Sequence, residues 1–179
     1  NKWGNFPSVS VGWNIKNEAF MENAEWLSAL KLRASWGING NDAIGNFVYA
    51  VYMNSGNNYI FGSGGNGSET IHLGAKPSGL ANPDARWEES RQTNVGLDAG
   101  FFGNRLTFTF DWYNKKTAGM LLSMPVPGYA GDSAPTGNLG DMVNRGIEIE
   151  IGWRDSAGDF NYHISANATW NKNKLTYLG

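Results

Sequence analysis

The sequence of 179 residues contains no cysteine. The lack of thiols excludes a disulfide-linked scaffold and a metal site built from thiolates. No apolar run approaches the ~20 residues that a membrane-spanning helix requires, which excludes helical insertion. The net charge is only −2, without the basic excess typical of nucleic-acid-binding proteins. A membrane β-barrel is not excluded, because polar positions alternate with the apolar ones along its strands.

The residues that are abundant point to β-structure. Glycine occurs 24 times and aromatic residues make up 13% of the chain, a mixture suited to twisted strands, turns and interfacial rings. The clearest segment, 160–170, alternates strictly, with Phe160, Ile164 and Trp170 among the residues of one face. Period-two alternation predicts a strand with one apolar side.

Six segments with this alternation predict an all-β, antiparallel sheet. The predicted strands are residues 8–15, 29–37, 90–101, 105–116, 145–154 and 160–170. Residues 16–26, 102–104 and 155–159 form short connections, whereas 38–89 and 117–143 form long ones. Regular alternation of short and long connections is typical of outer-membrane β-barrels, whose long loops are extracellular. Residues 17–32 also fit an amphipathic helix, so a short helical turn within 17–26 stays open.

The length of the last strand fits a membrane. Ten residue steps from Phe160 to Trp170 span about 33 Å, and a tilt of about 40° projects this to about 25 Å, the height of a barrel's apolar band. Six strands cannot close a large barrel, and unpaired backbone groups in lipid cost several kcal/mol each. The chain also begins with Asn1 rather than Met. We therefore expect a partial barrel domain, without a plug domain, belonging to a longer protein.

Several segments resemble a known family in their order along the chain. These are FPSVSVGWNI at 6–15, LKLRASWGINGN at 30–41, NPDARWEESRQTNVGLDAGFFGNRLTFTFDWYNKKT at 82–117 and NLGDMVNRGIEIEIGW at 138–153. Together they resemble the barrel of the SusC/RagA-like TonB-dependent outer-membrane transporters of Bacteroidota.

The resemblance implies a transmembrane barrel of 22 strands that is filled by a plug and opened by TonB. It implies active import of glycan oligosaccharides, or peptides, across the bacterial outer membrane. A SusD-like surface lipoprotein is the implied partner, together with TonB, the oligosaccharide or peptide substrate and membrane lipid. No cofactor, enzymatic activity or nucleic-acid partner is expected.

Four aromatic residues are candidates for contact with substrate or partner. Trp87 precedes the third strand near the rim and could stack on a sugar ring, although a structural role at the rim is the simpler interpretation. Tyr49, Tyr52 and Tyr59 lie in the long connection and could contact ligand or lipoprotein, or pack the loop on itself.

The ionisable residues give no catalytic pattern. Asp84, Glu88 and Glu89 are close in sequence, but glycoside hydrolysis requires two carboxyls at a fixed separation across a substrate. His72 and His163 lack companion ligands at metal-binding spacing. The charged residues of the polar faces are expected to form solvated barrel wall: Lys31, Arg33, Asp98, Asp111, Glu148 and Glu150.

Two other functions fit the residues alone. A soluble β-sandwich carbohydrate-binding module would also be rich in glycine, asparagine and exposed aromatics, but its apolar faces would pack against a second sheet within the chain. A passive porin or adhesin barrel would share the strand pattern and would lack a plug.

Overall fold

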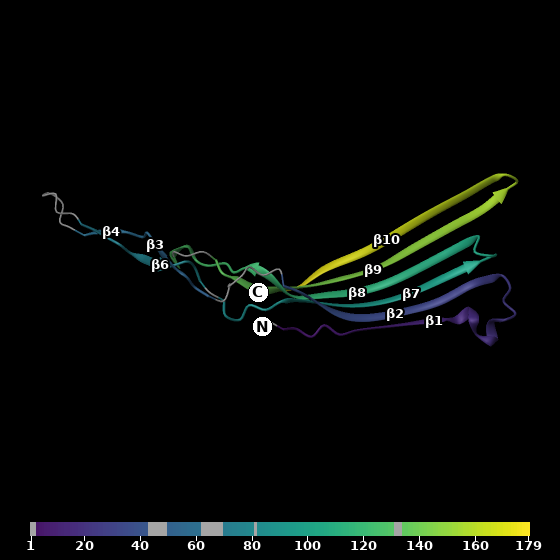
Figure 1. Ribbon diagram of the computed structural model, residues 1–179, viewed down its shortest axis with the longest axis horizontal. Coiled ribbons are helices and arrows are strands. Elements are labelled where there is room, and N and C mark those ends of the chain that lie inside the picture. Colours follow the sequence, from purple (N-terminus) through teal and green to yellow (C-terminus); the bar gives the residue numbers. More distant parts are fainter. Residues whose placement is uncertain (1–2, 43–49, 62–69, 81, 131–133) are drawn as a thin grey trace.

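The computed structural model describes residues 3–42, 50–61, 70–80, 82–130 and 134–179. Six antiparallel strands form one sheet in the order β1-β2-β7-β8-β9-β10 (Figure 1). They are β1 (Ser8–Asn14), β2 (Leu27–Asn41), β7 (Glu88–Phe101), β8 (Leu106–Ser123), β9 (Thr136–Ala157) and β10 (Phe160–Leu178). The predicted antiparallel sheet of six strands is therefore confirmed, and no helix of the described residues is long and apolar enough to cross a membrane.

The register brings the apolar faces of all six strands onto one side of the sheet. Val11 lies opposite Ala34, which lies opposite Val95. The same row continues through Trp112, Ile147 and Trp170. Because side chains alternate between faces with a period of two, the neighbouring row is polar and lies on the opposite side. The sheet thus has one continuous apolar face and one continuous polar face.

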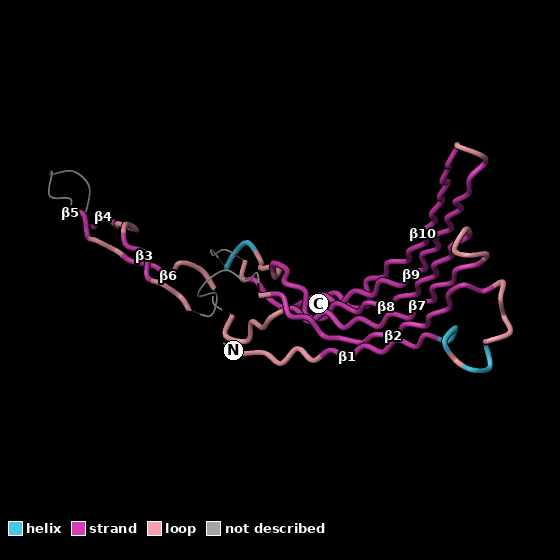
Figure 2. The backbone as a smooth tube through the Cα atoms, turned by 45° about the vertical axis from the view of Figure 1, so that its right-hand side comes forward, coloured by secondary structure: helices cyan, strands magenta, loops and turns pink. Residues whose placement is uncertain are grey.

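The apolar face has no second layer within the described part of the chain. Leu27 and Ala99 are the buried hydrophobic residues there, with exposures of 3% and 8%. By contrast, Ile164 is 64% exposed and Trp170 is 58% exposed. Both backbone views show a single curved layer (Figures 1 and 2). This arrangement argues against a β-sandwich, in which these residues would be covered.

Every strand of the sheet except β1 continues beyond its predicted end on the side of the long connections, and β8 and β9 do so by the most residues together. The prediction ended the fourth strand at 116 and began the fifth at 145, whereas β8 reaches Ser123 and β9 begins at Thr136. Irregular register between Thr117 and Leu121 interrupts the alternation and hides the continuation in the sequence. The connection predicted over 117–143 is therefore residues 124–135, with a 3-10 turn, η3, at Gly128–Ala130.

The longest connection contains four short strands in addition to the six strands of the main sheet. β3 (Met53–Ser55) pairs with β6 (Ala75–Pro77), and β4 (Tyr59–Phe61) pairs with β5 (Thr70–His72). We call these four strands the β-ribbon. It extends away from the six-stranded sheet, at the end opposite to the short turns (Figure 2).

The β1–β2 connection contains two 3-10 turns, η1 (Ile15–Asn17) and η2 (Ala19–Met21). The Lys16 ammonium donates hydrogen bonds to the carbonyls of Met21 and Ala24, at 2.9 and 3.1 Å. The helical turn left open within 17–26 is thus present, and the longer helix over 17–32 is not, because β2 begins at Leu27.

Candidate functional site: the polar face and its rim

Two neighbouring rows of the polar face, in the half nearer the short turns, carry six ionisable side chains from four strands. We call these residues the charged cluster: Lys31, Arg33, Asp98, Asp111, Glu148 and Glu150. Lys31 lies opposite Asp98, and Asp111 lies opposite Glu148. Four carboxylates face two cations, so this part of the wall is acidic.

Arg33 joins three strands within the charged cluster. Its Nε donates to Asp98 Oδ2 at 2.7 Å, and its Nη2 donates to Asp98 Oδ1 at 3.0 Å. The same Nη2 lies 3.1 Å from Asp111 on the next strand. A bidentate guanidinium–carboxylate pair fixes geometry as well as charge. Arg33 therefore ties β2 to β7 and β8 on the polar face.

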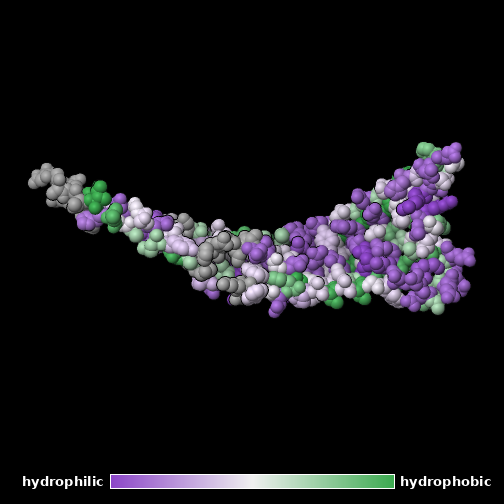
Figure 3. Space-filling view, in the orientation of Figure 1, coloured by the Kyte–Doolittle hydropathy of each residue, from purple (hydrophilic) through white to green (hydrophobic). Residues whose placement is uncertain are grey.

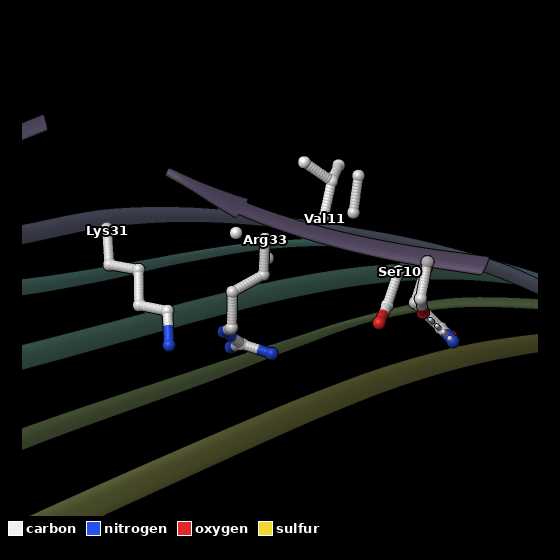
Figure 4. A pocket seen from close by; sticks show the side chains of 9 residues that line it. Ser10, Val11, Lys31 and Arg33 are labelled. Carbon is white, nitrogen blue, oxygen red and sulfur yellow. Dashed lines mark hydrogen bonds between the residues drawn. The ribbon is translucent and has the colours of Figure 1, made fainter. Parts of the chain in front are cut away.

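Gly96 makes this bridge possible. Arg33 lies opposite Gly96 in β7, and Gly96 lies opposite Asp111 in β8. A Cβ atom at Gly96 would stand 2.7 Å from Arg33 Nη2, inside van der Waals contact. In Figure 4, Arg33, Lys31 and Ser10 extend from one side of the strands, while Val11 points to the other. A shallow pocket of the polar face lies here, lined by Gly12 and Gly96 among other residues.

The polar face is mostly uncharged nearer the long connections. We call this region the amide zone: Ser35, Gln92, Asn94, Tyr113, Asn144 and Asn173. Asn94 Nδ2 donates to Ser35 Oγ at 3.1 Å, and Gln92 Nε2 donates to Asn94 Oδ1 at 2.8 Å. Asn173 Nδ2 donates to Asn144 Oδ1 at 2.7 Å. Amide and hydroxyl groups can both donate to and accept from neutral sugar hydroxyls or peptide groups.

At the rim, Asn138 of β9 holds the chain that leads into β7. Its Oδ1 accepts from the Arg86 backbone N–H at 2.8 Å, while its Nδ2 donates to the Arg86 carbonyl at 2.9 Å. The same Nδ2 donates to the carbonyl of Gly119 at 2.6 Å. Gly119 has a φ of +68°, which favours glycine and places it in the irregular part of β8. We call this arrangement the Asn138 clamp.

Glu88 adds a second attachment at the same rim. Its Oε1 accepts from the Leu121 backbone N–H and its Oε2 accepts from Asn41 Nδ2, each at 2.9 Å. Asn82 Nδ2 also donates to the Thr136 carbonyl at 2.8 Å. The segment 82–88, at the base of the longest connection, is thereby fixed against β2, β8 and β9.

Comparison with known proteins identifies the family to which a sheet with one apolar and one polar face belongs. Residues 1–178 match the family model described as TonB dependent receptor-like, beta-barrel. The chain belongs to this family. The resemblance inferred from the sequence segments is thus confirmed, and the sheet is part of the wall of an outer-membrane β-barrel, with its apolar face toward lipid and its polar face toward the interior.

Individual relatives agree with the family assignment. The TonB-dependent receptor SusC of Bacteroides thetaiotaomicron is 38% identical over 184 aligned residues, covering 99% of this chain and 18% of SusC. A TonB-dependent receptor of Formosa agariphila is 36% identical, with 98% of this chain and 16% of the relative covered. The chain therefore spans less than a fifth of the length of these curated relatives.

Solved structures show the same strand arrangement. A structure of the RagAB peptide transporter superposes with a TM-score of 0.80 at 33% identity, covering 97% of this chain and 18% of that chain. The RagAB peptide importer in its closed-closed state gives a TM-score of 0.81 at 32% identity, with the same two coverages. The fold of this chain is thus similar to a part of each of these transporter chains.

The four residues predicted to contact substrate or partner lie in different parts of the chain. The Trp87 ring stacks on Phe6, with 5.6 Å between ring centroids, so part of its surface already serves the rim. Tyr52 and Tyr59 belong to the β-ribbon region and are 53% and 64% exposed. Tyr49 lies outside the described residues. Contact of any of the four with ligand or lipoprotein stays a prediction.

The neighbouring carboxylates Glu88 and Glu89 take part in separate interactions. Glu89 pairs with Arg91 at 3.0 Å, while Glu88 belongs to the rim attachments described above. His163 lies opposite Arg154 on the polar face. Among the described residues, no three histidine, aspartate or glutamate side chains are grouped so that they could hold a metal ion.

Two of these features are not apparent from the alternation of apolar and polar residues. The charged cluster was expected only as solvated wall, and nothing in the sequence pattern singled out Asn138. A partial indication was available for Asp111, because the tight turn at Phe102–Asn104 sets the β7–β8 register and so places Asp111 opposite Gly96.

Proposed function

We propose that this chain forms part of the barrel of a TonB-dependent importer that takes up oligosaccharides, or peptides, across the outer membrane. TonB drives opening, and a SusD-like lipoprotein captures substrate at the extracellular face. The chain contributes wall and rim rather than catalysis. The observation that carries the proposal is the single-layered sheet with a lipid-facing apolar side and a hydrogen-bonding interior side, in a chain that resembles SusC over its whole length.

The interior face supports a neutral, hydroxyl-rich or amide-rich substrate. The amide zone lies toward the long, extracellular connections, where a substrate would enter first. Its amide and hydroxyl side chains donate and accept hydrogen bonds, and Lys115, opposite Gln92, is a charged neighbour in the same row. Among the similar proteins, one is the TonB-dependent receptor SusC and another belongs to the RagAB peptide transporter. Oligosaccharides and peptides both present the groups that this surface could bind.

The aromatic residues of the long connection are proposed contacts at the entrance. Tyr59 of the β-ribbon and Tyr52, the residue before β3, are exposed and could stack on sugar rings or on the lipoprotein. Tyr49 is proposed for the same role from its position in the sequence. Trp87 lies at the base of the same connection, and its stacking on Phe6 leaves it a smaller share of any contact.

The test uses the full-length receptor in its own bacterium. A deletion strain is supplied with wild-type or variant receptor, and uptake of labelled oligosaccharides and labelled peptides is measured with and without a protonophore. We expect uptake of one of these two substrate classes to require the receptor and to stop when the proton-motive force is dissipated. Uptake that continues unchanged with the protonophore would instead identify a passive porin.

A variant of the entrance tests the proposed contacts. Tyr52→Ala combined with Tyr59→Ala is expected to lower uptake several-fold, whereas the corresponding Phe substitutions keep the rings and retain most of it. Equal uptake by the Ala and wild-type receptors would remove these tyrosines from the proposal. If the deletion strain takes up both substrates as fast as the strain with the receptor, the import function is contradicted.

A further inference from the structure

Five basic side chains lie on the lipid-facing side of β7 to β10, in the two rows that follow Trp112 and Trp170 toward the long connections. On β1 and β2 the same rows are still apolar, with Val9, Trp36 and Ile38. On β8 to β10, Trp112 and Trp170 flank Ile147 at the border of the apolar band. Two residues further toward the long connections, the same face carries Arg145 opposite Lys172. We call the five cations of this and the next row the basic belt: Arg91, Lys116, Arg145, Lys172 and Lys174.

The belt holds more positive charge than its neighbours neutralise. All five side chains are exposed. Glu89 pairs with Arg91 at 3.0 Å and Asp141 pairs with Lys116 at 3.5 Å. Five cations and two carboxylates leave an excess of three positive charges. Arg145 Nε donates to the neutral Asn114 Oδ1, at 3.0 Å, which orients the guanidinium without cancelling its charge.

The opposite border of the apolar band differs in charge. Beyond Trp153, the same face continues with Asp155, whose carboxylate lies 3.6 Å from Arg105 Nη1. Tyr162 lies opposite Asp155. The described residues of the short-turn border therefore show a paired acid and aromatic rings where the other border shows surplus cations. An asymmetry of this kind indicates a difference between the two leaflets that the sheet meets.

We propose that the basic belt binds the phosphate groups of the phosphorylated glycolipid of the outer leaflet. The belt continues the apolar band directly, so a lipid whose acyl chains cover Trp112 and Trp170 brings its headgroup to the height of Lys172 and Arg145. Arginine and lysine form charge-assisted hydrogen bonds with phosphate oxygens. The inference rests on the position of the sheet in the outer membrane and not on the substrate proposed above.

The test measures lipid binding by the purified full-length receptor in a maltoside detergent. Native mass spectrometry records bound monophosphorylated lipid A, with dephosphorylated lipid A and inorganic phosphate as separate probes. Each cation near a charged lipid surface contributes about a fivefold change in affinity. We therefore expect Lys172→Gln with Lys174→Gln to weaken binding of the phosphorylated lipid by about tenfold or more, and added salt to weaken it in the wild type.

The matched control is Lys115→Gln, which removes one positive charge beside Lys116 but on the polar face, opposite Gln92. It should leave lipid binding unchanged. Equal losses in the control and the double variant would overturn the proposal, as would equal binding of the two lipids. Competition by inorganic phosphate at the same concentration as the lipid would also overturn it, because it would identify a site for free anions.

Folding and transport are read separately. The heat-dependent shift in gel mobility of the closed barrel reports folding of each variant, and Arg145→Gln replaces the double variant if that one fails to fold. Because lipid binding is measured without substrate, failure of the import function would leave this result intact. Failure of lipid binding would likewise leave uptake unaffected.

Discussion

A single glycine controls how the charged cluster is assembled. Arg33 crosses β7 over Gly96 to reach Asp111, and the space above Gly96 is what the guanidinium occupies. Glycine within a strand usually destabilises it relative to alanine by roughly 0.5–1 kcal/mol. At this position the sign should reverse, because a methyl group would displace Arg33 from two carboxylates.

We predict that Gly96→Ala lowers the free energy of unfolding of the full-length barrel by about 1 kcal/mol, the scale of a partly exposed ion-pair network. Urea titration in lipid vesicles, followed by tryptophan fluorescence, measures it. Gly12→Ala is the matched control, since Gly12 lies in the same row opposite Arg33 and a Cβ there meets its nearest atom, Lys31 Cε, at 3.3 Å. The control should be neutral or slightly stabilising; a loss as large as that of Gly96→Ala would contradict this role for Arg33.

At the scale of elements, side-chain amides at the rim make the hydrogen bonds that a neighbouring strand's backbone would otherwise make. The Asn138 clamp presents one acceptor and one donor to Arg86, much as a neighbouring strand would. Residues 82–87 are thereby attached to the sheet although they are not part of a ladder.

We predict that Asn138→Ala frees segment 82–87 while the strands remain paired. Hydrogen exchange of the Arg86 amide should accelerate about tenfold, which corresponds to a hydrogen bond of about 1.4 kcal/mol. Asn138→Asp keeps the acceptor for Arg86 N–H and should show a smaller effect at that amide. Asn144→Ala, a control on the same strand, removes only the contact with Asn173. Unchanged exchange at Arg86 in the Ala variant would show that the clamp does not hold the segment.

The elements also show what the sequence could predict. The alternation from Phe160 to Trp170 and from Ile147 to Trp153 gave the faces correctly, because a period of two needs no knowledge of partners. The continuation of β8 past Thr117 was missed, because the register is irregular there and apolar and polar residues no longer alternate with a period of two. The strands of the β-ribbon have three residues each, which is too short for a period to appear.

The charged cluster shows the same limit for the candidate site. Asp98 and Asp111 belong to a hairpin whose tight turn fixes their register, so their proximity followed from the sequence. Arg33 reaches them only through the β2–β7 register, which spans the longest connection of the chain. No local pattern sets that register; continuous apolar and polar faces across the whole sheet set it.

For the whole molecule, the sheet cannot be a stable unit in water. β1 and β10 are edge strands, and their outer backbone groups lack a neighbouring strand within the described residues. The apolar face is also exposed, with Val11 at 66% and Ile164 at 64%. Unpaired edges beside an apolar face favour association between copies.

We predict that residues 1–179, expressed alone, aggregate in detergent-free buffer and remain dispersed only in detergent, as light scattering and size-exclusion chromatography would record. The full-length receptor, refolded into lipid vesicles under matched conditions, should instead show the heat-dependent gel shift of a closed barrel, because its further strands pair both edges. A folded, monodisperse monomer of 1–179 in plain buffer would mean that the apolar face is covered within the chain, and would contradict its contact with lipid.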